Sequence, residues 1–584
     1  MLNKKYTDKL CKIQDKYITY FEKTKGMGSP AYQDIISYYK TLAADFSQVQ
    51  VKEMGLTDSG YPLHLVIYDP GETIQPDSWK ANGKIIVFIN NAIHAGEPPG
   101  IDASMMFLRD VLLGKTEIPD DIVLAIVPIC NIDGHLNRGH SHPIKNGPIE
   151  YGTRKNAKDF DLNRDFIKAD TQNTKSFQEI YHWLKPHIFI DTHEDTFNDI
   201  QHVTTLVATQ HNRLGGQLGN YLEKEMLPAL YNKMEENNFP MVPYVCYMES
   251  GNLSAGLKHS NDNARYSTGF AALFNTIGFM PETNRLKPYK ERVNSVYSLF
   301  KTFMEVLNKD GERIVHMTEE DREAVKIQKS FALNYKLNKE KFKMVSYLGY
   351  KSSQKTSDVS GQSFLYYDQN KPFTTELKWY DQFDPGISIK KPQAYIIPQR
   401  WLNIVKNLKR NGVTLEKLEK ESILRVTVYH IKKLETSKKP FEKHNLHSNI
   451  SVKKSKEQIN IKKGDYLLPM NQESNKFVME VLEPEGENSF FAWNYFDSIL
   501  DKTLLGSGND DFVQPREITN PIFEDMAADY LKENPDLRMK LEALKKKDKA
   551  FSQDGSAQLF WVYKHSPWDA DGGANRYPIY RVEK

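Results

Sequence analysis

The sequence contains little cysteine and no long apolar run. Its 584 residues include 3 cysteines, Cys11, Cys130 and Cys246, which lie far apart and form neither a CxxC pair nor a disulfide framework. No stretch has the length of a transmembrane helix, and the N-terminus lacks an apolar segment of signal-peptide length. We therefore expect no membrane span and a cytoplasmic location by default, with a mature secreted or periplasmic form as the alternative.

An excess of one charge sign is also missing. The chain has 78 Lys and Arg against 76 Asp and Glu, a net charge of +2, which gives no basic footprint for nucleic acid. The apolar fraction of 39% suits packed globular domains, and the length exceeds what one ordinary core supports. We therefore expect several globular domains and no nucleic-acid partner, and the oligomeric state stays open.

Apolar runs and amphipathic segments alternate between residues 84 and 308. The runs predict strands at 84–90, 122–129, 187–192, 203–209 and 271–281. The amphipathic segments predict helices at 99–113, 171–184, 213–237 and 288–308. This alternation is typical of an α/β domain with a mixed, mostly parallel sheet and helices on both faces.

The texture of the sequence changes after about residue 310. A charged helical stretch is followed by short strand-like segments and many Lys-rich turns. We therefore expect a β-rich α+β C-terminal region that ends in a helical segment near 520–545. The expected division is an N-terminal helical segment at 1–29, an α/β domain at 30–310, a helical connector at 311–330 and the C-terminal region, of unknown role, at 331–584.

A histidine and a glutamate follow the first predicted strand of the α/β domain. His94 and Glu97 stand three residues apart, between that strand and the next predicted helix. Open α/β sheets build their sites at the carboxyl ends of strands, and these two ligand types suit zinc. The turn is therefore a candidate for half of a metal site. The alternative is structural, with a turn histidine and a glutamate that stabilises the start of the helix.

Two further predicted strands end in residues that would complete such a site. One is followed by His193 and another by Glu282. A zinc hydrolase of the His₂Glu type needs a third ligand, and it also needs a carboxylate base and cationic groups for the developing oxyanion. His193 is the candidate ligand and Glu282 the candidate base. The structural alternative for Glu282 is a salt bridge with Arg285.

Arginine and asparagine residues lie between these segments. Arg154 precedes the run Asp161-Leu162-Asn163-Arg164-Asp165. An Asn-Arg pair suits bidentate recognition of a carboxylate, and a separate arginine suits a developing negative charge. The bland alternative for both arginines is an ordinary surface position.

In their order along the chain, these elements resemble the zinc carboxypeptidase family, in its large bacterial type with a C-terminal extension. The order is His-x-x-Glu, Arg, Asp-x-Asn-Arg, His and a strand-borne Glu, and the segment Pro128–Gly134 is similar to a further stretch of the family. The resemblance covers roughly residues 30–310. It implies that this range is a zinc carboxypeptidase-like catalytic domain.

The resemblance implies a role for each matching position. His94, Glu97 and His193 would bind one zinc ion per chain, and Glu282 would be the general base for a zinc-activated water. Arg154 would polarise the scissile carbonyl and stabilise the oxyanion.

The resemblance also implies substrate contacts, and here the sequence departs from the family. Asn163 and Arg164 would hold the terminal carboxylate of the substrate. Tyr266 is the candidate for the substrate-capping tyrosine, and Arg265 beside it would be an extra anion contact. Pancreatic-type enzymes carry an arginine just before the ligand glutamate, where this chain has Gly96.

Three functions follow from these patterns. The first is a zinc-dependent metallocarboxypeptidase that hydrolyses C-terminal peptide bonds. The second is a zinc amidase that acts on acylated amino acids or cell-wall peptides, and Gly96, Arg265 and the large C-terminal region favour it. The third is a non-catalytic peptide-binding relative in which residues 331–584 carry the function. The expected ligand is a peptide or a small acyl-amino acid.

Overall fold

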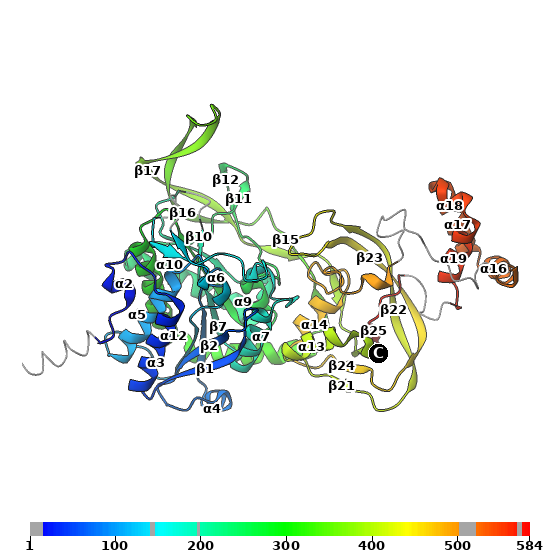
Figure 1. Cartoon of the computed structure of the whole chain (residues 1–584), viewed down its shortest axis with the longest axis horizontal. Coiled ribbons are helices and arrows are strands. Elements are labelled where there is room, and N and C mark those ends of the chain that lie inside the picture. Colours follow the sequence, from blue (N-terminus) through cyan, green and yellow to red (C-terminus); the bar gives the residue numbers. More distant parts are fainter. Residues whose placement is uncertain (1–15, 141–145, 196–198, 501–520, 569–574, 584) are drawn as a thin grey trace, which may run out of the picture. The chain divides into compact units, whose positions relative to one another are not determined.

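The computed structural model describes residues 16–140, 146–195, 199–500, 521–568 and 575–583. Contacts within the chain divide it into two compact units, each built from more than one segment (Figure 1). The first unit comprises Met1–Lys391, Asn403–Thr414 and Asn471–Glu480. The second comprises Pro392–Leu402, Leu415–Met470 and Val481–Lys584.

A nine-stranded sheet forms the centre of the first unit as far as it is described. Its order is β1-β2-β4-β3-β7-β13-β9-β10, and β8 also pairs with β13. The middle strands β4, β3, β7 and β13 run parallel, whereas β2 and β9 join them antiparallel. The strands are β1 Val49–Leu56, β2 Pro62–Tyr68, β3 Ile85–Asn90, β4 Ile122–Val127, β7 Ile188–Asp191, β8 His193–Asp195, β9 Thr204–Ala208, β10 Val242–Pro243 and β13 Ile277–Asn284. The prediction of a mixed, mostly parallel sheet is confirmed.

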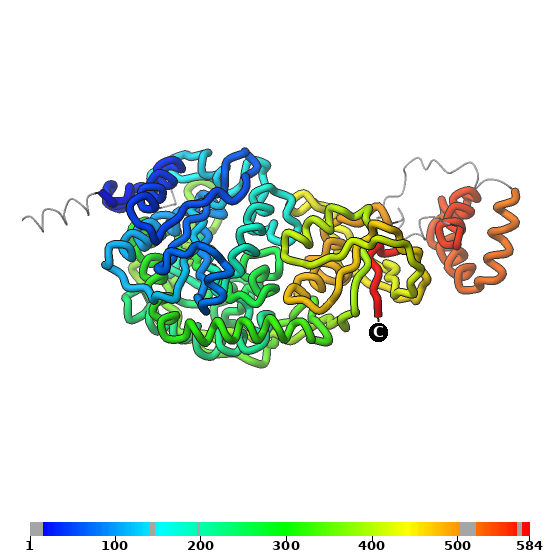
Figure 2. The backbone as a smooth tube through the Cα atoms, turned by 90° about the horizontal axis from the view of Figure 1, so that it is seen from below, coloured from blue at the N-terminus to red at the C-terminus, as the bar shows by residue number. Residues whose placement is uncertain are grey.

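Helices cover both faces of this sheet. On one face, Phe177 of α7 stacks on Phe88 of β3 with 5.6 Å between ring centroids. On the other face, α12 packs against Phe279 of β13. Phe88 pairs with Phe189 and Phe279 with Ile190, and because successive strand residues alternate, the two rings point to opposite faces. The helices are α5 Pro99–Leu112, α7 Gln172–Leu184, α11 Ser267–Ala272 and α12 Tyr289–Ile327, the long green helix of Figure 2.

Helix α12 runs through the expected boundary at residue 310. Its 39 residues join the predicted helix 288–308 to the predicted connector. Gly311 does not end it, because the buried face of the helix continues through Ile314 and Val325. A Cβ at Gly311 would meet Ile85 at an ordinary 3.7 Å, so that position is also packed. The division into 1–29, 30–310, 311–330 and 331–584 stays a prediction.

Two predicted elements differ from the structure for local reasons. The run 271–281 is not one strand, because α11 ends at Ala272 and Asn275, at φ 53°, separates it from β13. The segment 213–237 is not one helix. Gly215 and Gly216, at φ 64° and 61°, break it after its first turn. The resulting helices are α8 His211–Leu214, α9 Gly216–Tyr221, the π-helical turn Leu222–Met226 and α10 Leu227–Glu236.

A second sheet in the first unit carries a long hairpin. Its order is β11-β12-β17-β16, and β16 and β17 form a ribbon that extends away from the central sheet in Figure 1. The base of the ribbon is held by a cluster in which Tyr347, Leu377 and Trp379 pack on Val242 and Leu257. The strands are β11 Tyr247–Glu249, β12 Asn252–Lys258, β16 Lys343–Thr356 and β17 Ser363–Tyr380. The described part of the unit also contains short strand pairs, β5 Gly139–His140 with β6 Glu150–Tyr151, β14 Ser330–Ala332 with β19 Ser388–Lys390 and β15 Tyr335–Leu337 with β18 Phe383–Pro385.

The second unit contains a six-stranded sheet of order β21-β24-β20-β25-β22-β23. Its strands are β20 Ala394–Ile397, β21 Glu416–Lys417, β22 Ser422–Thr436, β23 His447–Ile461, β24 Tyr466–Pro469 and β25 Tyr580–Val582. Between β24 and β25 in the sequence, the described residues include the helices α14 Asn475–Leu482, α16 Pro521–Glu533, α17 Pro535–Lys547, α18 Lys549–Gln553 and α19 Gly555–Lys564. The prediction of a β-rich α+β C-terminal region is confirmed. Among the described residues, none of the helices combines the length and the hydropathy needed to cross a bilayer.

Candidate active site

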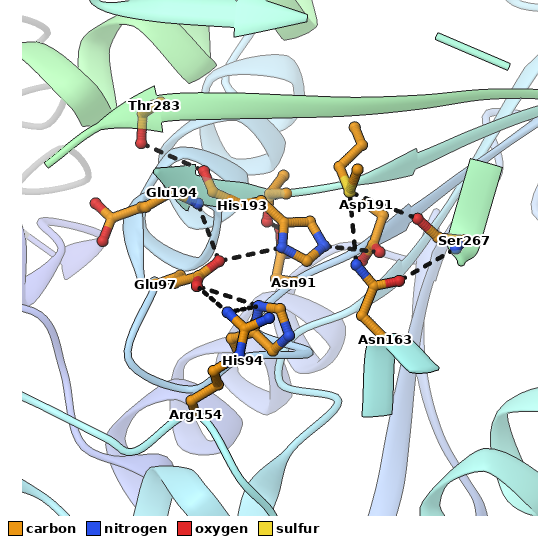
Figure 3. A network of polar contacts seen from close by, with 12 residues as sticks. Asn91, His94, Glu97, Arg154, Asn163, Asp191, His193, Glu194, Ser267 and Thr283 are labelled. Atoms are coloured by element: carbon orange, nitrogen blue, oxygen red, sulfur yellow. Dashed lines mark hydrogen bonds and ion pairs between the residues drawn. The ribbon is translucent and has the colours of Figure 1, made fainter. Parts of the chain in front are cut away.

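Three buried side chains meet at the carboxyl edge of the central sheet. His94 and Glu97 lie in the turn between β3 and α5, and His193 opens β8 (Figure 3). The Nδ1 atoms of both histidines lie 3.1 Å from the Glu97 carboxylate, one from each oxygen. The three side chains offer ligand atoms that lie within 4.8 Å of one another. The structure thus brings together the three residues expected to bind zinc.

The outer nitrogen of each imidazole is bound by a buried carboxylate. Nε2 of His94 lies 2.9 Å from Asp161, and Nε2 of His193 lies 2.9 Å from Asp191. Asp191 also accepts a 2.8 Å hydrogen bond from Asn90 at the end of β3. Carboxylates in this position fix the tautomer and the orientation of a metal-binding histidine. The donor set therefore fits a zinc ion of the His₂Glu type.

The charges around Glu97 keep this carboxyl ionised. Burial alone would raise its pKa, but His94, His193 and the Arg285 guanidinium hold it well below its usual range. Burial would conversely lower the pKa of His193, and the carboxylates of Asp191 and Glu97 raise it well above the usual value. Because a metal ion binds the neutral imidazole, its binding at His193 displaces a proton.

Two arginines reach the same oxygen of Glu97. Nη1 of Arg154 lies 3.3 Å from Glu97 Oε1, and its Nε and Nη2 bind Asp161 at 3.0 and 2.8 Å. Its side chain is 45% exposed, so it faces the open side of the cluster. Nη2 of Arg285 lies 2.6 Å from Glu97 Oε1. Two cations, Arg154 and Arg285, therefore lie where the catalytic arginine was expected.

Glu282 stands beside His193 on the neighbouring strand β13. The two residues are partners in the parallel pairing of β13 and β8. Its side chain is half-buried, and its Oε2 has no hydrogen-bond partner among the described residues. Burial raises its pKa well above the usual value, Glu97 adds to that rise, and His193 opposes it. Arg285, the alternative partner of Glu282, forms its ion pairs with Glu97 and Glu194 instead.

The expected substrate-binding residues cluster on the other side of His193, where Figure 3 places Asn163. Asn163 is buried, and its Oδ1 accepts a 3.2 Å hydrogen bond from the backbone of Ser267. Arg164 donates to the Asn163 carbonyl at 2.8 Å, and its guanidinium lies 4.4 Å from the centre of the Tyr266 ring. Asn163, Arg164 and Tyr266 thus form one contiguous group.

Gly96, the position that departs from pancreatic-type enzymes, is crowded by backbone. A Cβ there would lie 3.0 Å from the carbonyl oxygen of Gly152 and 3.6 Å from the ring of Tyr151. A long side chain at this position would have to displace that loop. The second cation at the cluster comes instead from Arg285, at the end of β13.

An ion-pair chain behind Glu97 was not predicted from the sequence. Glu194 is fully buried, donates its backbone N–H to Glu97 Oε2 at 2.9 Å and pairs with the fully buried Arg292 of α12. Arg285 links the two carboxylates, at 2.6 Å from Glu97 and 3.6 Å from Glu194. Asp191 was also missed, although a polar residue that ends an apolar strand was a usable signal. Arg292 gave no such signal, because it belongs to a helix far along the chain.

A buried His–Glu–His cluster lies at the carboxyl edge of a mixed sheet, with a carboxylate on the next strand and cations nearby. Metal-dependent hydrolases use this set of groups. The sequence model of the zinc carboxypeptidase family matches residues 35–222, which include all three residues of the cluster. Residues 35–222 are therefore similar to the zinc carboxypeptidase family, and the class expected from the sequence, a zinc metallopeptidase, is confirmed.

Fungal proteins are among the similar sequences. Carboxypeptidase 2 of Trichophyton rubrum is 23% identical over 434 residues, which cover 70% of this chain and 74% of that protein. A probable carboxypeptidase 2 of Arthroderma benhamiae is 22% identical over 424 residues, which cover 68% of this chain and 73% of that protein.

Solved structures also resemble part of the chain. A putative carboxypeptidase A of Shewanella denitrificans has a TM-score of 0.36 at 14% identity, over 48% of this chain and 71% of that one. A metallo-carboxypeptidase of Pseudomonas aeruginosa, in complex with (2-guanidinoethylmercapto)succinic acid, has a TM-score of 0.35 at 15% identity, over 47% of this chain and 68% of that one.

Proposed function

We propose that this protein is a zinc-dependent metallocarboxypeptidase that hydrolyses C-terminal peptide bonds. The observation that carries the proposal is the cluster of His94, Glu97 and His193, with the unpartnered Oε2 of Glu282 on the adjacent strand. The names of the similar proteins support a peptide as the substrate.

His94, Glu97 and His193 would hold one zinc ion, which supplies a Lewis acid and a water of lowered pKa. Glu282 takes a proton from the attacking water and passes it to the leaving amine, because its free oxygen lies next to the strand position of His193. Arg154 faces the open side of the cluster, where it stabilises the negative charge that develops on the scissile carbonyl oxygen.

Arg164 and Asn163 bind the terminal carboxylate of the substrate in this proposal. The Arg164 guanidinium lies against the Tyr266 ring, which limits its rotation and holds it ready for a planar carboxylate. The hydrogen bond from the Ser267 backbone fixes the amide of Asn163. Tyr266 therefore acts on the substrate through Arg164.

Metal content and a peptide digest test the proposed function together. We expect close to one zinc per chain by elemental analysis. We also expect release of C-terminal amino acids from a peptide library, with loss of that release after chelation and recovery after zinc is returned. Mass spectrometry of the digest reads the released residue directly. Protein that holds no zinc and binds peptides without cleaving them would contradict the proposal.

The same experiment separates the amidase alternative. N-acyl dipeptides, γ-glutamyl peptides and acyl-aspartates are offered in parallel with the peptide library. Turnover of acyl-aspartates alone would replace the carboxypeptidase by an amidase, whereas turnover of peptides with free C-termini supports the proposal.

Asp191→Asn is expected to weaken zinc binding. The amide keeps the size of the side chain but removes the charge that binds His193 Nε2, so zinc affinity should fall about 10- to 100-fold. Competition with a chromogenic chelator measures this affinity. Asp69→Asn is the matched control, because Asp69 is equally buried but binds Trp79 and Lys84 away from the cluster. Equal zinc affinity in the Asp191→Asn protein and the wild type would refute the role.

A further inference from the structure

The ribbon of β16 and β17 is longer than the body that supports it. Its inner half is held by the buried cluster around Tyr347 and Trp379. Beyond Tyr350, residues 351–356 of β16 and 363–366 of β17 are all exposed. A two-stranded ribbon without further packing is marginally stable in water. We call this outer part, residues 351–368, the arm.

The arm exposes three consecutive apolar side chains. Phe364, Leu365 and Tyr366 are 45%, 50% and 39% exposed. Because strand side chains alternate, Phe364 and Tyr366 lie on one face of the ribbon and Leu365 on the other. Single exposed apolar residues are ordinary, but apolar side chains exposed on both faces of the same ribbon indicate a binding surface.

A bulge fixes the direction of the arm. Tyr350 pairs with Pro372, and the next residue, Lys351, pairs with Asp368, so residues 369–371 of β17 are left outside the ladder. Bulges bend a ribbon and are often found beside active sites. Gln369 within this bulge donates a 2.8 Å hydrogen bond to Asp199. This hydrogen bond therefore links the bend to Asp199, which follows β8 in the sequence.

The base of the arm contacts residues that follow the candidate ligand His193 and the candidate base Glu282 in the sequence. Gln201, which follows the His193 strand, donates its side-chain amide to the Gly349 carbonyl at 2.8 Å. Lys287, five residues after Glu282, lies 5.0 Å from the centre of the Tyr350 ring and 3.8 Å from Asp199. The segments that carry the candidate ligand and the candidate base therefore lead directly to the arm.

We propose that the arm binds the upstream part of an extended polypeptide substrate, whose C-terminal residue lies at the zinc cluster. This inference rests on the proposed carboxypeptidase function. At residues 363–366 the described partner of β17 is β16 alone, because β12 pairs with β17 only at Trp379 and Tyr380, so the outer edge of β17 accepts an added strand. The apolar group around Leu365 then contacts alternate side chains of that strand.

The length of the arm sets which substrates it contacts. Tyr366 and Phe364 pair with Ser353 and Lys355, three and five residues beyond Tyr350. At about 3.3 Å per residue, the apolar group lies roughly 10–17 Å beyond Tyr350. An extended substrate has a similar rise, so it must continue about three to five residues past Tyr350 to reach the apolar group. Dipeptide substrates do not reach the arm.

The test compares a short and a long substrate with the same last two residues, an N-acyl dipeptide and a peptide of about twelve residues. The full chain carries Phe364→Ser, Leu365→Ser and Tyr366→Ser together. We expect unchanged kcat/KM on the dipeptide and a loss of at least about tenfold on the long peptide, because apolar burial is removed. Ile327→Ser, at a more exposed apolar position on α12, is the control and should change neither.

Each result of this test either supports or overturns the proposal that the arm binds the substrate. Equal loss on both substrates, or no loss on the long peptide, overturns the proposal. Light scattering on the same proteins tests the other possible occupant of the arm, a second copy of the chain. That occupant is assigned if the wild type is a dimer, the triple variant is a monomer and the long-peptide kinetics are unchanged. If the wild type cleaves neither substrate, the proposed function fails, and fluorescence anisotropy of a labelled long peptide still tests the arm. Wild-type binding that the triple variant loses supports it, and equal binding overturns it.

Discussion

Glu282→Gln is expected to abolish most peptide hydrolysis while zinc stays bound. The amide has the size of the carboxyl but cannot take the proton of the attacking water, and loss of a general base costs about 10²- to 10⁴-fold in rate. Zinc content should not change, because Glu282 is outside the His94–Glu97–His193 cluster. The kcat of a long peptide and elemental analysis of the same sample measure the two quantities.

Glu249→Gln is the control for this experiment, because Glu249 is an exposed glutamate on β11. It should leave both kcat and zinc content at the wild-type level. A Glu282→Gln protein with full activity would remove Glu282 from the mechanism. Loss of zinc together with activity would mean that Glu282 holds the cluster together rather than moving a proton.

Glu194→Gln is expected to destabilise the first unit by about 3–5 kcal/mol, because it leaves the buried Arg292 guanidinium without its anion. Arg292 is fully buried, and its other hydrogen bonds go to the carbonyl oxygens of Lys287, Asn146 and Gly147. Its guanidinium also lies 5.1 Å from the centre of the Tyr289 ring. Neutral acceptors do not replace the lost charge. Denaturant unfolding, followed by a spectroscopic signal from residues of the first unit, measures the change in its free energy of unfolding.

Two variants make the test of the buried pair sharper. Glu225→Gln breaks the Glu225–Arg313 pair, whose side chains are about half exposed, and should cost far less than Glu194→Gln, because water screens an exposed ion pair. The double variant Glu194→Gln with Arg292→Met removes both buried charges and should recover part of the loss. A cost below about 1 kcal/mol for Glu194→Gln alone would show that Arg292 does not depend on its partner.

The sequence predicted the strands of the central sheet well where apolar runs were short and bounded. The predicted strands 84–90 and 187–192 differ from β3 and β7 by at most one residue at either end. The error at 271–281 arose because an apolar run with no clear period reads equally as helix or strand. The first part of that run became α11, and only a left-handed turn at Asn275 marks the change.

The candidate site was predictable only where its residues ended strands. His193 and Glu282 each follow an apolar run, so their convergence at one sheet edge follows from parallel pairing. Asp191 binds His193 two residues further on, so its place at the end of an apolar strand was a local signal that was not used. Arg285 was considered only as a partner of Glu282, because its contact with Glu97 joins residues 188 positions apart in the chain. No local pattern encodes such contacts. The arm was unrecognisable for the same reason, since exposure is a property of the folded chain.

The place of β25 in the second unit has a consequence for how the chain is made. β25 lies between β20 and β22, although residues 470–579 separate it in the sequence from β24, the previous strand of the same sheet. At about 5–20 residues per second, a ribosome needs roughly 5 to 20 seconds to produce that interval. Throughout this time the strand position between β20 and β22 is empty, and the edges of these two strands can pair with other chains. The helices α16 to α19 are synthesised during this interval. The sheet of the second unit is complete only when its last strand, β25, pairs with β20 and β22.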